Sequence, residues 1–175
     1  MARTLCGRQE NALPLELSPM AFLRAVFCLL ALSVATLAAP SADPSADVLE
    51  VSVRETSAGK YMIGVTLETS DVDCTHYANW WEVLSEDGEL LYRRILRHSH
   101  AATQPFTRYS EDDVSLEEDQ EIIVRAHMHV DGKELYPDSQ VLKGSAKAGF
   151  AKATLEKNFA AAVEKEGPQA EGCLY

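Results

Sequence analysis

The stretch "NWWEVLSEDGELLYRRIL", residues 79–96, bears most directly on the fold. Two runs rich in aromatic and branched apolar residues flank "EDG", a turn signal that typically joins two strands into a hairpin. No alternation of strands with long helices, which a parallel sheet would need, is visible on either side. The stretch therefore predicts an all-β protein with antiparallel strands.

Further strands are predicted on both sides of this hairpin. Residues 48–55 alternate with a period of two, and residues 61–69 are rich in aromatic and β-branched types. Residues 121–130 resume strand character, and a last strand lies near "QVLKG". The acidic stretch 104–120 is predicted to be a surface loop with at most one short edge strand. This spacing of strands and turns predicts an immunoglobulin-like β-sandwich over residues 48–145.

The two ends of the chain differ from this pattern. The C-terminal segment, residues 146–175, changes to alanine and lysine, with apolar residues at helical spacing over 146–167, and is predicted to be a helical tail. Residues 40–47 are predicted to be a Pro- and Ser-containing linker. Residues 1–39 are predicted to be a leader and signal peptide.

The signal-peptide prediction depends on the order of residue types before Pro40. Arg24 precedes the apolar run 25–32, and small residues near Ala38 suit cleavage. A retained N-terminal anchor is the alternative. Residues 1–19 indicate either that Met20 is the true start or that targeting has two parts. The prediction is a secreted, extracytoplasmic protein with no membrane association beyond the signal segment.

Charge excludes two classes of partner. The chain carries a formal net charge of −11. Without residues 1–39, which hold three arginines and two glutamates, 13 basic and 25 acidic residues remain. Nucleic acid and anionic membranes are bound through Lys and Arg, so such a surface repels both.

Two cysteines, Cys74 and Cys173, lie outside the leader and signal. In an oxidising compartment they could form a disulfide that fastens the tail to the body. The alternatives are a free thiol or soft metal ligand at Cys74, or an intermolecular bond through Cys173.

All five histidines belong to ligand-capable pairs separated by one residue. "RHSH" contains His98 and His100, and "RAHMH" contains His127 and His129. The fifth histidine, His76, follows Cys74 by two positions. Side chains two residues apart on a strand point to the same face, so both can approach one ion.

The alternation of residues 121–130 predicts where the second pair points. Ile122, Val124, Ala126, Met128 and Val130 form the apolar face, which leaves His127 and His129 on the opposite, non-core face. A core position therefore fits this pair poorly. The position of His98 and His100 depends on where the preceding strand ends.

These residues predict a copper or zinc site formed chiefly by His98, His100, His127 and His129, with His76 in reserve and Cys74 as a possible further ligand, because both metals favour nitrogen and sulfur ligands. Structural histidines or a pH-responsive cluster are the alternatives. Tyr77, Trp80 and Trp81 could form an aromatic binding surface or fill the core. The arginines near the hairpin could hold an anion or make ion pairs with the acidic residues.

The run "YANWWEVLSEDGELLYRRILRHSH", followed by "QPFTR" and "IIVRAHMH", resembles a small, poorly characterised family of secreted or lipid-anchored proteins. In that family YAxWWEVL, LYRR, HSH, QPFTR and RAHMH recur in this order. The resemblance covers about residues 70–150 and implies an exported single domain, but it carries over no catalytic residue. This chain departs from the family in having "VDGKELYPDS" where a glycine-rich turn is common.

The leading functional hypothesis is a secreted β-sandwich whose histidine pairs bind copper or zinc, for binding rather than catalysis. The alternative is a non-catalytic structural or interaction module whose "QPFTR" loop and aromatic residues contact a protein or glycan. A hydrolase or oxidase is a third hypothesis. No glycine-rich phosphate loop, nucleophile elbow or spaced Ser-His-Asp triad supports it.

Overall fold

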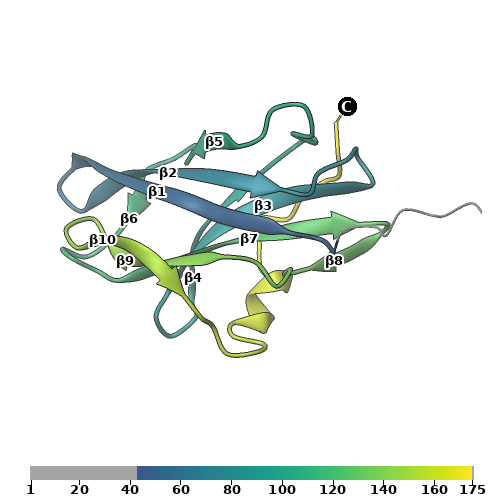
Figure 1. Cartoon of the computed structure of the whole chain (residues 1–175). Helices are drawn as coiled ribbons and strands as arrows, with labels where there is room; N and C mark the ends of the chain where they lie inside the picture. The colour runs from purple at the N-terminus through teal and green to yellow at the C-terminus, as the bar shows by residue number, and fades with distance from the viewer. Residues whose placement is uncertain (1–42, 175) are drawn as a thin grey trace, which may run out of the picture. The chain divides into compact units, whose positions relative to one another are not determined.

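The computed structural model describes residues 43–174, which form two antiparallel sheets (Figure 1). Sheet A contains β1 (Ala46–Ser57), β2 (Lys60–Thr69), β5 (Phe106–Tyr109) and β6 (Val114–Ser115). Sheet B contains β3 (His76–Ser85), β4 (Leu90–Ile95), β7 (Ile122–Val130), β8 (Lys133–Leu135), β9 (Val141–Ser145) and β10 (Gly149–Ala153). The prediction of an all-β protein with antiparallel strands is confirmed.

The predicted hairpin over residues 79–96 is formed by β3 and β4. Trp80 lies opposite Ile95, and Glu82 lies opposite Arg93. Gly88 adopts a φ of 85° in the connecting turn, a left-handed conformation that glycine adopts without a side-chain penalty. In sheet A the order is β1-β2-β5, with β6 also paired to β2; in sheet B it is β10-β9-β7-β3-β4, with β8 paired to β7.

The main core lies between the two sheets. Sheet A contributes Ile63, Val65 and Leu67 from β2, and sheet B contributes Trp81 and Val83 from β3. Residues of β7 follow the predicted alternation, since their apolar face, Ile122, Val124, Ala126 and Met128, belongs to this core. Burial of these side chains supplies the main force that holds the sheets together.

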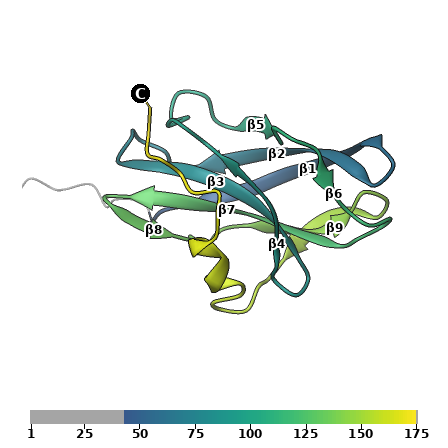
Figure 2. The same ribbon diagram turned by 180° about the vertical axis from the view of Figure 1, so that it is seen from behind.

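The opposite face of sheet B is covered by the chain's own C-terminal end. We call residues 155–174 the C-terminal strap. Figure 2 shows it running from the short helix η1 (Ala161–Lys165) toward the C-terminus along this side of sheet B. Val163 of the strap joins Leu84 and Ile123 in a second, smaller apolar cluster.

The predicted helical tail is wrong over much of its length. Residues 149–153 form the edge strand β10, and the helix is limited to the five residues of η1. Gly144 allows β9 and β10 to approach closely, because a Cβ at this position would lie 1.9 Å from the Gly149 carbonyl oxygen. Pairing with β9 therefore overrides the helix propensity of the alanine-rich segment.

Other boundaries also differ from the predictions. Two short strands, β5 and β6, lie within the acidic stretch that was expected to form a loop with one edge strand. Sheet residues extend beyond the expected range of 48–145, from Ala46 in β1 to Ala153 in β10. The predicted leader, signal peptide and first linker residues, 1–42, lie outside the described residues.

Candidate functional site

His127 lies on the face of sheet B that the sequence predicts to be away from the core, yet its side chain is fully buried. Its ring stacks on Trp80 with centroids 3.7 Å apart, and the edge of Tyr136 meets it at 4.6 Å. The inference that a buried position fits this pair poorly is therefore wrong at His127. Alternation correctly placed His127 on the face of sheet B opposite the main core, but other residues cover that face.

The protonation state of His127 follows from its neighbours. Asn79 donates its amide Nδ2 to Glu134, 2.7 Å away, so the Asn79 carbonyl oxygen accepts a hydrogen bond from His127 Nδ1 at 2.8 Å. Burial, aided by the charges of Arg93 and Arg125, lowers the pKa of His127 to about 3. The ring is therefore neutral and carries its proton on Nδ1.

His129 is the more exposed member of the pair. Its Nδ1 lies 2.5 Å from Oε1 of Glu134, whose other carboxylate oxygen accepts from Asn79. The same carboxylate lies 3.6 Å from His127 Nδ1. Glu134 is thus hydrogen-bonded to His129 directly and linked to His127 through Asn79. It comes from β8, which pairs with β7 across a tight turn.

Next to the histidines lies a buried Arg-Glu-Arg triad. Glu82 of β3 is fully buried and receives Nε and Nη2 of Arg93 at 3.0 and 2.8 Å and Nε of Arg125 at 2.8 Å. Register explains the arrangement, because Glu82 lies opposite Arg93 of β4 and opposite Arg125 of β7. Both carboxylate oxygens are satisfied, as a buried ion requires.

Aromatic rings flank the two arginines. The Arg93 guanidinium lies 4.5 Å from the Trp80 ring, and that of Arg125 lies 3.6 Å from the Tyr136 ring, distances typical of cation–π contacts. Burial and the nearby Glu82 charge raise the pKa of Tyr136. The rings of Trp80, His127 and Tyr136 therefore form a row of contacts with Arg93 at one end and Arg125 at the other.

The first histidine pair lies elsewhere, in the loop after β4. β4 ends at Ile95, so His98 and His100 are not on a strand. The His100 ring is buried and stacks on Phe106 with centroids 3.8 Å apart, while its main-chain N–H donates to Asp71 at 2.7 Å. Burial, with smaller effects of Arg108 and His98, lowers the pKa of His100 to about 4.

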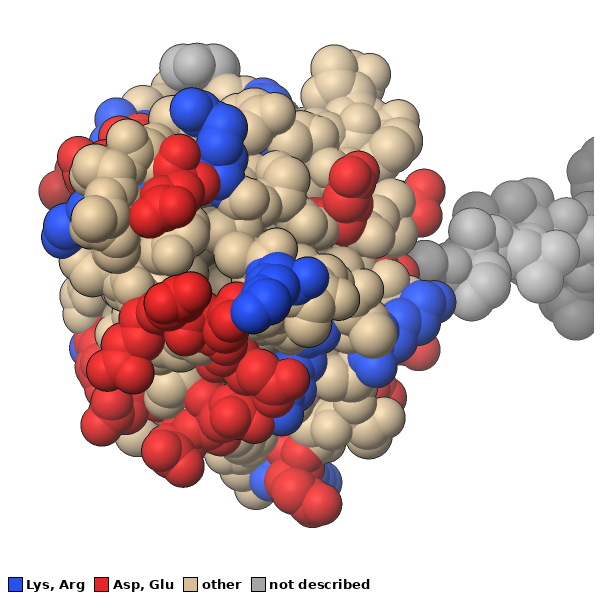
Figure 3. Space-filling model, turned by 90° about the vertical axis from the view of Figure 1, so that its left-hand side faces the viewer, with Lys and Arg blue, Asp and Glu red and all other residues tan. Residues whose placement is uncertain are grey.

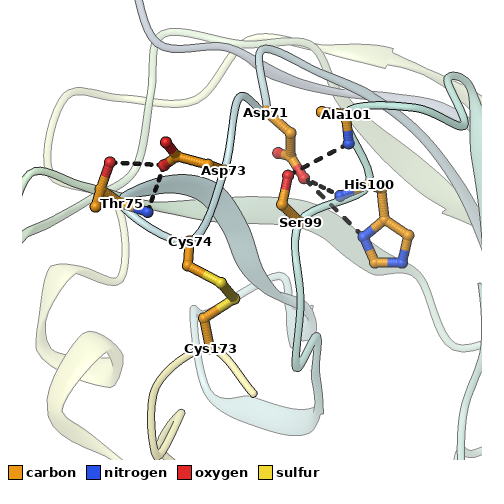
Figure 4. The surroundings of a disulfide bond; sticks show 8 residues. All are labelled: Asp71, Asp73, Cys74, Thr75, Ser99, His100, Ala101 and Cys173. Atoms are coloured by element: carbon orange, nitrogen blue, oxygen red, sulfur yellow. Dashed lines mark hydrogen bonds and ion pairs between the residues drawn. A yellow bond between two sulfur atoms is a disulfide. The ribbon is translucent and has the colours of Figure 1, made fainter. Parts of the chain in front are cut away.

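His76 and Cys74 do not form a ligand pair. His76 Nε2 lies 3.2 Å from the Ser70 hydroxyl, and Cys74 forms a disulfide with Cys173 (Figure 4). Nearby, the buried Asp71 carboxylate accepts hydrogen bonds from Ala78 and His100 main-chain N–H groups, which fixes the β2–β3 connection against the loop after β4.

No group of three or more His, Cys, Asp or Glu side chains within residues 43–174 is arranged to hold a metal ion. The pair His98 and His100 and the pair His127 and His129 therefore do not make a joint centre. The ring of His127 is fixed between two aromatic residues and an amide, and that of His100 lies against Phe106. The metal-binding prediction gains no support from this arrangement.

The aromatic residues do not form an exposed binding surface. Tyr77, Trp80 and Trp81 are all buried, with Trp81 in the core between the sheets and Trp80 under Arg93. In "QPFTR", Phe106 is buried and Gln104 donates to the Thr69 hydroxyl at 2.7 Å. Phe106 and Gln104 therefore anchor this loop to the rest of the chain, and contact of the loop with a protein or glycan stays a prediction.

Several residues that contact the histidines or form the triad were not anticipated from the sequence: Asp71, Asn79, Glu82, Glu134 and Tyr136. Glu82 had a usable signal, since it is a lone charge inside the apolar run "NWWEVL". A charged residue there must be paired if both faces of the strand are covered. Coverage by the strap is a long-range feature that local periodicity does not reveal.

The surface charge is uneven. Figure 3 shows Asp and Glu side chains gathered over one area of the face it displays. The segment 110–121 alone contributes seven exposed acidic residues. Some acidic residues are paired, such as Asp119 with Lys147 at 2.9 Å and Glu121 with Lys143 at 3.1 Å. Exposed pairs of this kind contribute little to stability.

The comparisons with known proteins give one partial relative. Over 87 residues the chain is 34% identical to a protein of Halomicrobium mukohataei named "Putative lipoprotein". The aligned part covers 50% of this chain and 42% of that protein, so the chain spans less than half of the relative's length. No family model matches the chain, and no solved structure matches it. Within residues 43–174, no helix is long and apolar enough to cross a membrane.

Proposed function

We propose that this protein is an extracytoplasmic, immunoglobulin-like β-sandwich module with a non-catalytic binding or structural role. The observation that carries the proposal is the burial of its chemically versatile side chains. Internal contacts occupy each of them. Glu82 forms ion pairs with Arg93 and Arg125, and both arginines also donate to main-chain carbonyl groups. His127 is hydrogen-bonded to Asn79. Groups fixed in this way stabilise a particular structure and are poorly placed to act on a substrate.

Three features support the extracytoplasmic location. The predicted signal peptide would direct export, and a disulfide between Cys74 and Cys173 persists in oxidising compartments. The partial relative is named a lipoprotein, a class attached to membranes from outside the cytoplasm.

The strand order supports the immunoglobulin-like assignment. The first two strands pair with each other, the second pairs with the fifth, and the other sheet orders the ninth, seventh, third and fourth. Immunoglobulin-type sandwiches divide their strands in this manner and carry a buried tryptophan on the third strand, where Trp81 lies here.

The experiment compares His127→Ala with His129→Ala. If the histidines are structural, His127→Ala lowers the free energy of unfolding by about 2–4 kcal/mol, because it leaves a cavity and an unpaired Asn79 oxygen. His129→Ala, which removes a partly exposed ring, then costs less than about 1 kcal/mol. Neither value changes when a chelator is added.

Copper or zinc binding stays the competing hypothesis, and the same samples test it. Elemental analysis of the purified protein, and thermal unfolding with added copper or zinc, would show a stoichiometric metal and a raised Tm if it is correct. Both substitutions would then reduce the bound metal. That outcome would overturn the structural role proposed for the β7 histidines.

A further inference from the structure

The C-terminal strap is held by contacts to its main chain. Arg93 donates to the carbonyl oxygens of Val163, Glu166 and Pro168 at 2.5, 2.6 and 3.1 Å. Arg125 donates to the carbonyl oxygens of Phe159 and Ala160 at 2.8 and 3.1 Å. Two guanidinium groups thus make five hydrogen bonds to backbone acceptors, which every peptide offers irrespective of its side chains.

Few strap side chains are buried. Val163 alone is fully buried among the described strap residues, while Leu155, Phe159 and Ala160 are half-buried around it. This cluster is separate from the core between the sheets. The strap can therefore leave sheet B without opening the main core.

The side chains of sheet B that lie beneath the strap are charged and can be hydrated when they are uncovered. Glu82, Arg93 and Arg125 are at most 5% exposed when the strap is in place. Buried ions lose hydration that water restores when they are uncovered, so release of the strap recovers part of the free energy that docking costs. A cover over charged groups is consequently easier to remove than a cover over an apolar face of the same size.

A covalent tether offsets this weak docking. Cys173 lies at the far end of the strap and is bonded to Cys74, in the connection between β2 and β3 (Figure 4). Both cysteines are partly exposed. The bond keeps the strap at a high effective concentration next to its binding face.

We propose that the face of sheet B formed by Trp80, Glu82, Arg93, Arg125 and Tyr136 is a peptide-binding face. The strap occupies it in cis through residues 159–168, and the Cys74–Cys173 disulfide keeps it occupied. A dithiol reductant releases the strap: the reductant loses two electrons and two protons and forms its own disulfide, and the protein disulfide becomes two thiols. The vacated face then accepts another peptide through its carbonyl groups. This deepens the proposed function by assigning the module a face and a partner.

Hydrogen exchange of the full protein, oxidised and reduced with dithiothreitol, tests the release. The strap amides of Ala161, Val163 and Glu166 are hydrogen-bonded within the strap. We expect their exchange to become at least tenfold faster on reduction, while the amides paired between β3 and β7 remain slower to exchange than the strap amides. Cys173→Ser should reproduce the change without reductant. Unchanged strap exchange, or strap amides that exchange no faster than those of β3 and β7 after reduction, would overturn the proposal.

A labelled synthetic peptide of residues 155–170 tests the binding face. It should bind the reduced protein at least tenfold more tightly than the oxidised protein, in which the strap blocks the face. Equal affinity for both forms, or no binding to either, would overturn the assignment of the face. These outcomes are separable from the His127 and metal experiments, since strap exchange and peptide binding report on the strap and its face, whereas the His127 experiment reports on the stability of the whole fold.

Discussion

His127 and His100 are buried by different neighbours, but both are neutral for the same reason. Neither ring has a carboxylate within hydrogen-bonding distance that would stabilise its charged form: His127 Nδ1 is 3.6 Å from Glu134, and His100 Nδ1 is 4.0 Å from Asp71. Desolvation therefore dominates and lowers both pKa values. Each residue stabilises the fold only while it stays unprotonated.

This makes stability depend on pH in a defined direction. The unfolded chain takes up a proton at each histidine near pH 6.5, whereas the native pKa is about 3 for His127 and about 4 for His100. The full contribution is present above pH 6.5 and is lost as the pH falls toward these native values. Between pH 6.5 and 5, the free energy of unfolding should fall by up to about 1.4 kcal/mol per pH unit for each histidine.

Urea unfolding of the wild type and of His127→Gln at a series of pH values measures the pH dependence of the free energy of unfolding. The variant should show a shallower slope than the wild type between pH 6.5 and 5, and the two slopes should agree above pH 7. An identical slope in both proteins over the acidic range would show that His127 takes up its proton in the native state as easily as in the unfolded chain.

At the scale of elements, the turn of the β3–β4 hairpin also contacts the strap. Its turn residue Gly88 lies against the strap, since a Cβ at this position would come within 2.9 Å of the Ala160 Cβ. Gly132, in the β7–β8 turn, has a similar φ of 78°, but a Cβ there would meet nothing within 4 Å. The two turns therefore share a backbone conformation and differ in what covers them.

Gly88→Ala should consequently be more harmful than Gly132→Ala. Both substitutions place a side chain in the left-handed region, at a cost of about 1–2 kcal/mol. Gly88→Ala adds steric overlap with the strap, which should bring about 1–3 kcal/mol more. Chemical denaturation of the two variants gives the difference directly. Equal losses would mean that the strap shifts away from the turn without cost.

Sequence periodicity and turn signals gave correct predictions for β7 and for the β3–β4 hairpin. Alternation located β7 and its core face correctly, and the turn signal located the β3–β4 hairpin. It failed in the segment 146–167, because helical spacing of apolar residues says nothing about an open sheet edge. The edge of β9 offers main-chain hydrogen bonds to residues 149–153, and these decide the local structure.

At the scale of the whole molecule, the disulfide joins residues separated by 99 positions, which spans most of the described chain. It connects the strap on the outside of sheet B to the turn before β3. A cross-link over such a loop restricts the unfolded chain strongly, by about 4–5 kcal/mol in the chain-entropy treatment. The bond therefore contributes to global stability as well as to docking of the strap.

The double variant Cys74→Ala/Cys173→Ala tests this contribution. Its free energy of unfolding in urea should be about 4–5 kcal/mol lower than that of the oxidised wild type, and the reduced wild type should resemble the variant. A loss below about 1 kcal/mol would show that the unfolded chain is already restricted without the bond.

The sequence by itself determined the class of fold, the main hairpin and the two faces of β7, because these depend on the order of polar and apolar residues along a single strand. The tertiary structure alone decided the environments of His127, Glu82 and Arg125. They lie on a face that is polar by pattern. Distant segments cover it, because the strap lies over Arg125 and Arg93, and Trp80 and Tyr136 enclose His127. Residues that the sequence suggests are metal ligands or surface charges are therefore buried by distant segments of the chain. They are paired with one another because burying an unpaired polar group costs too much free energy.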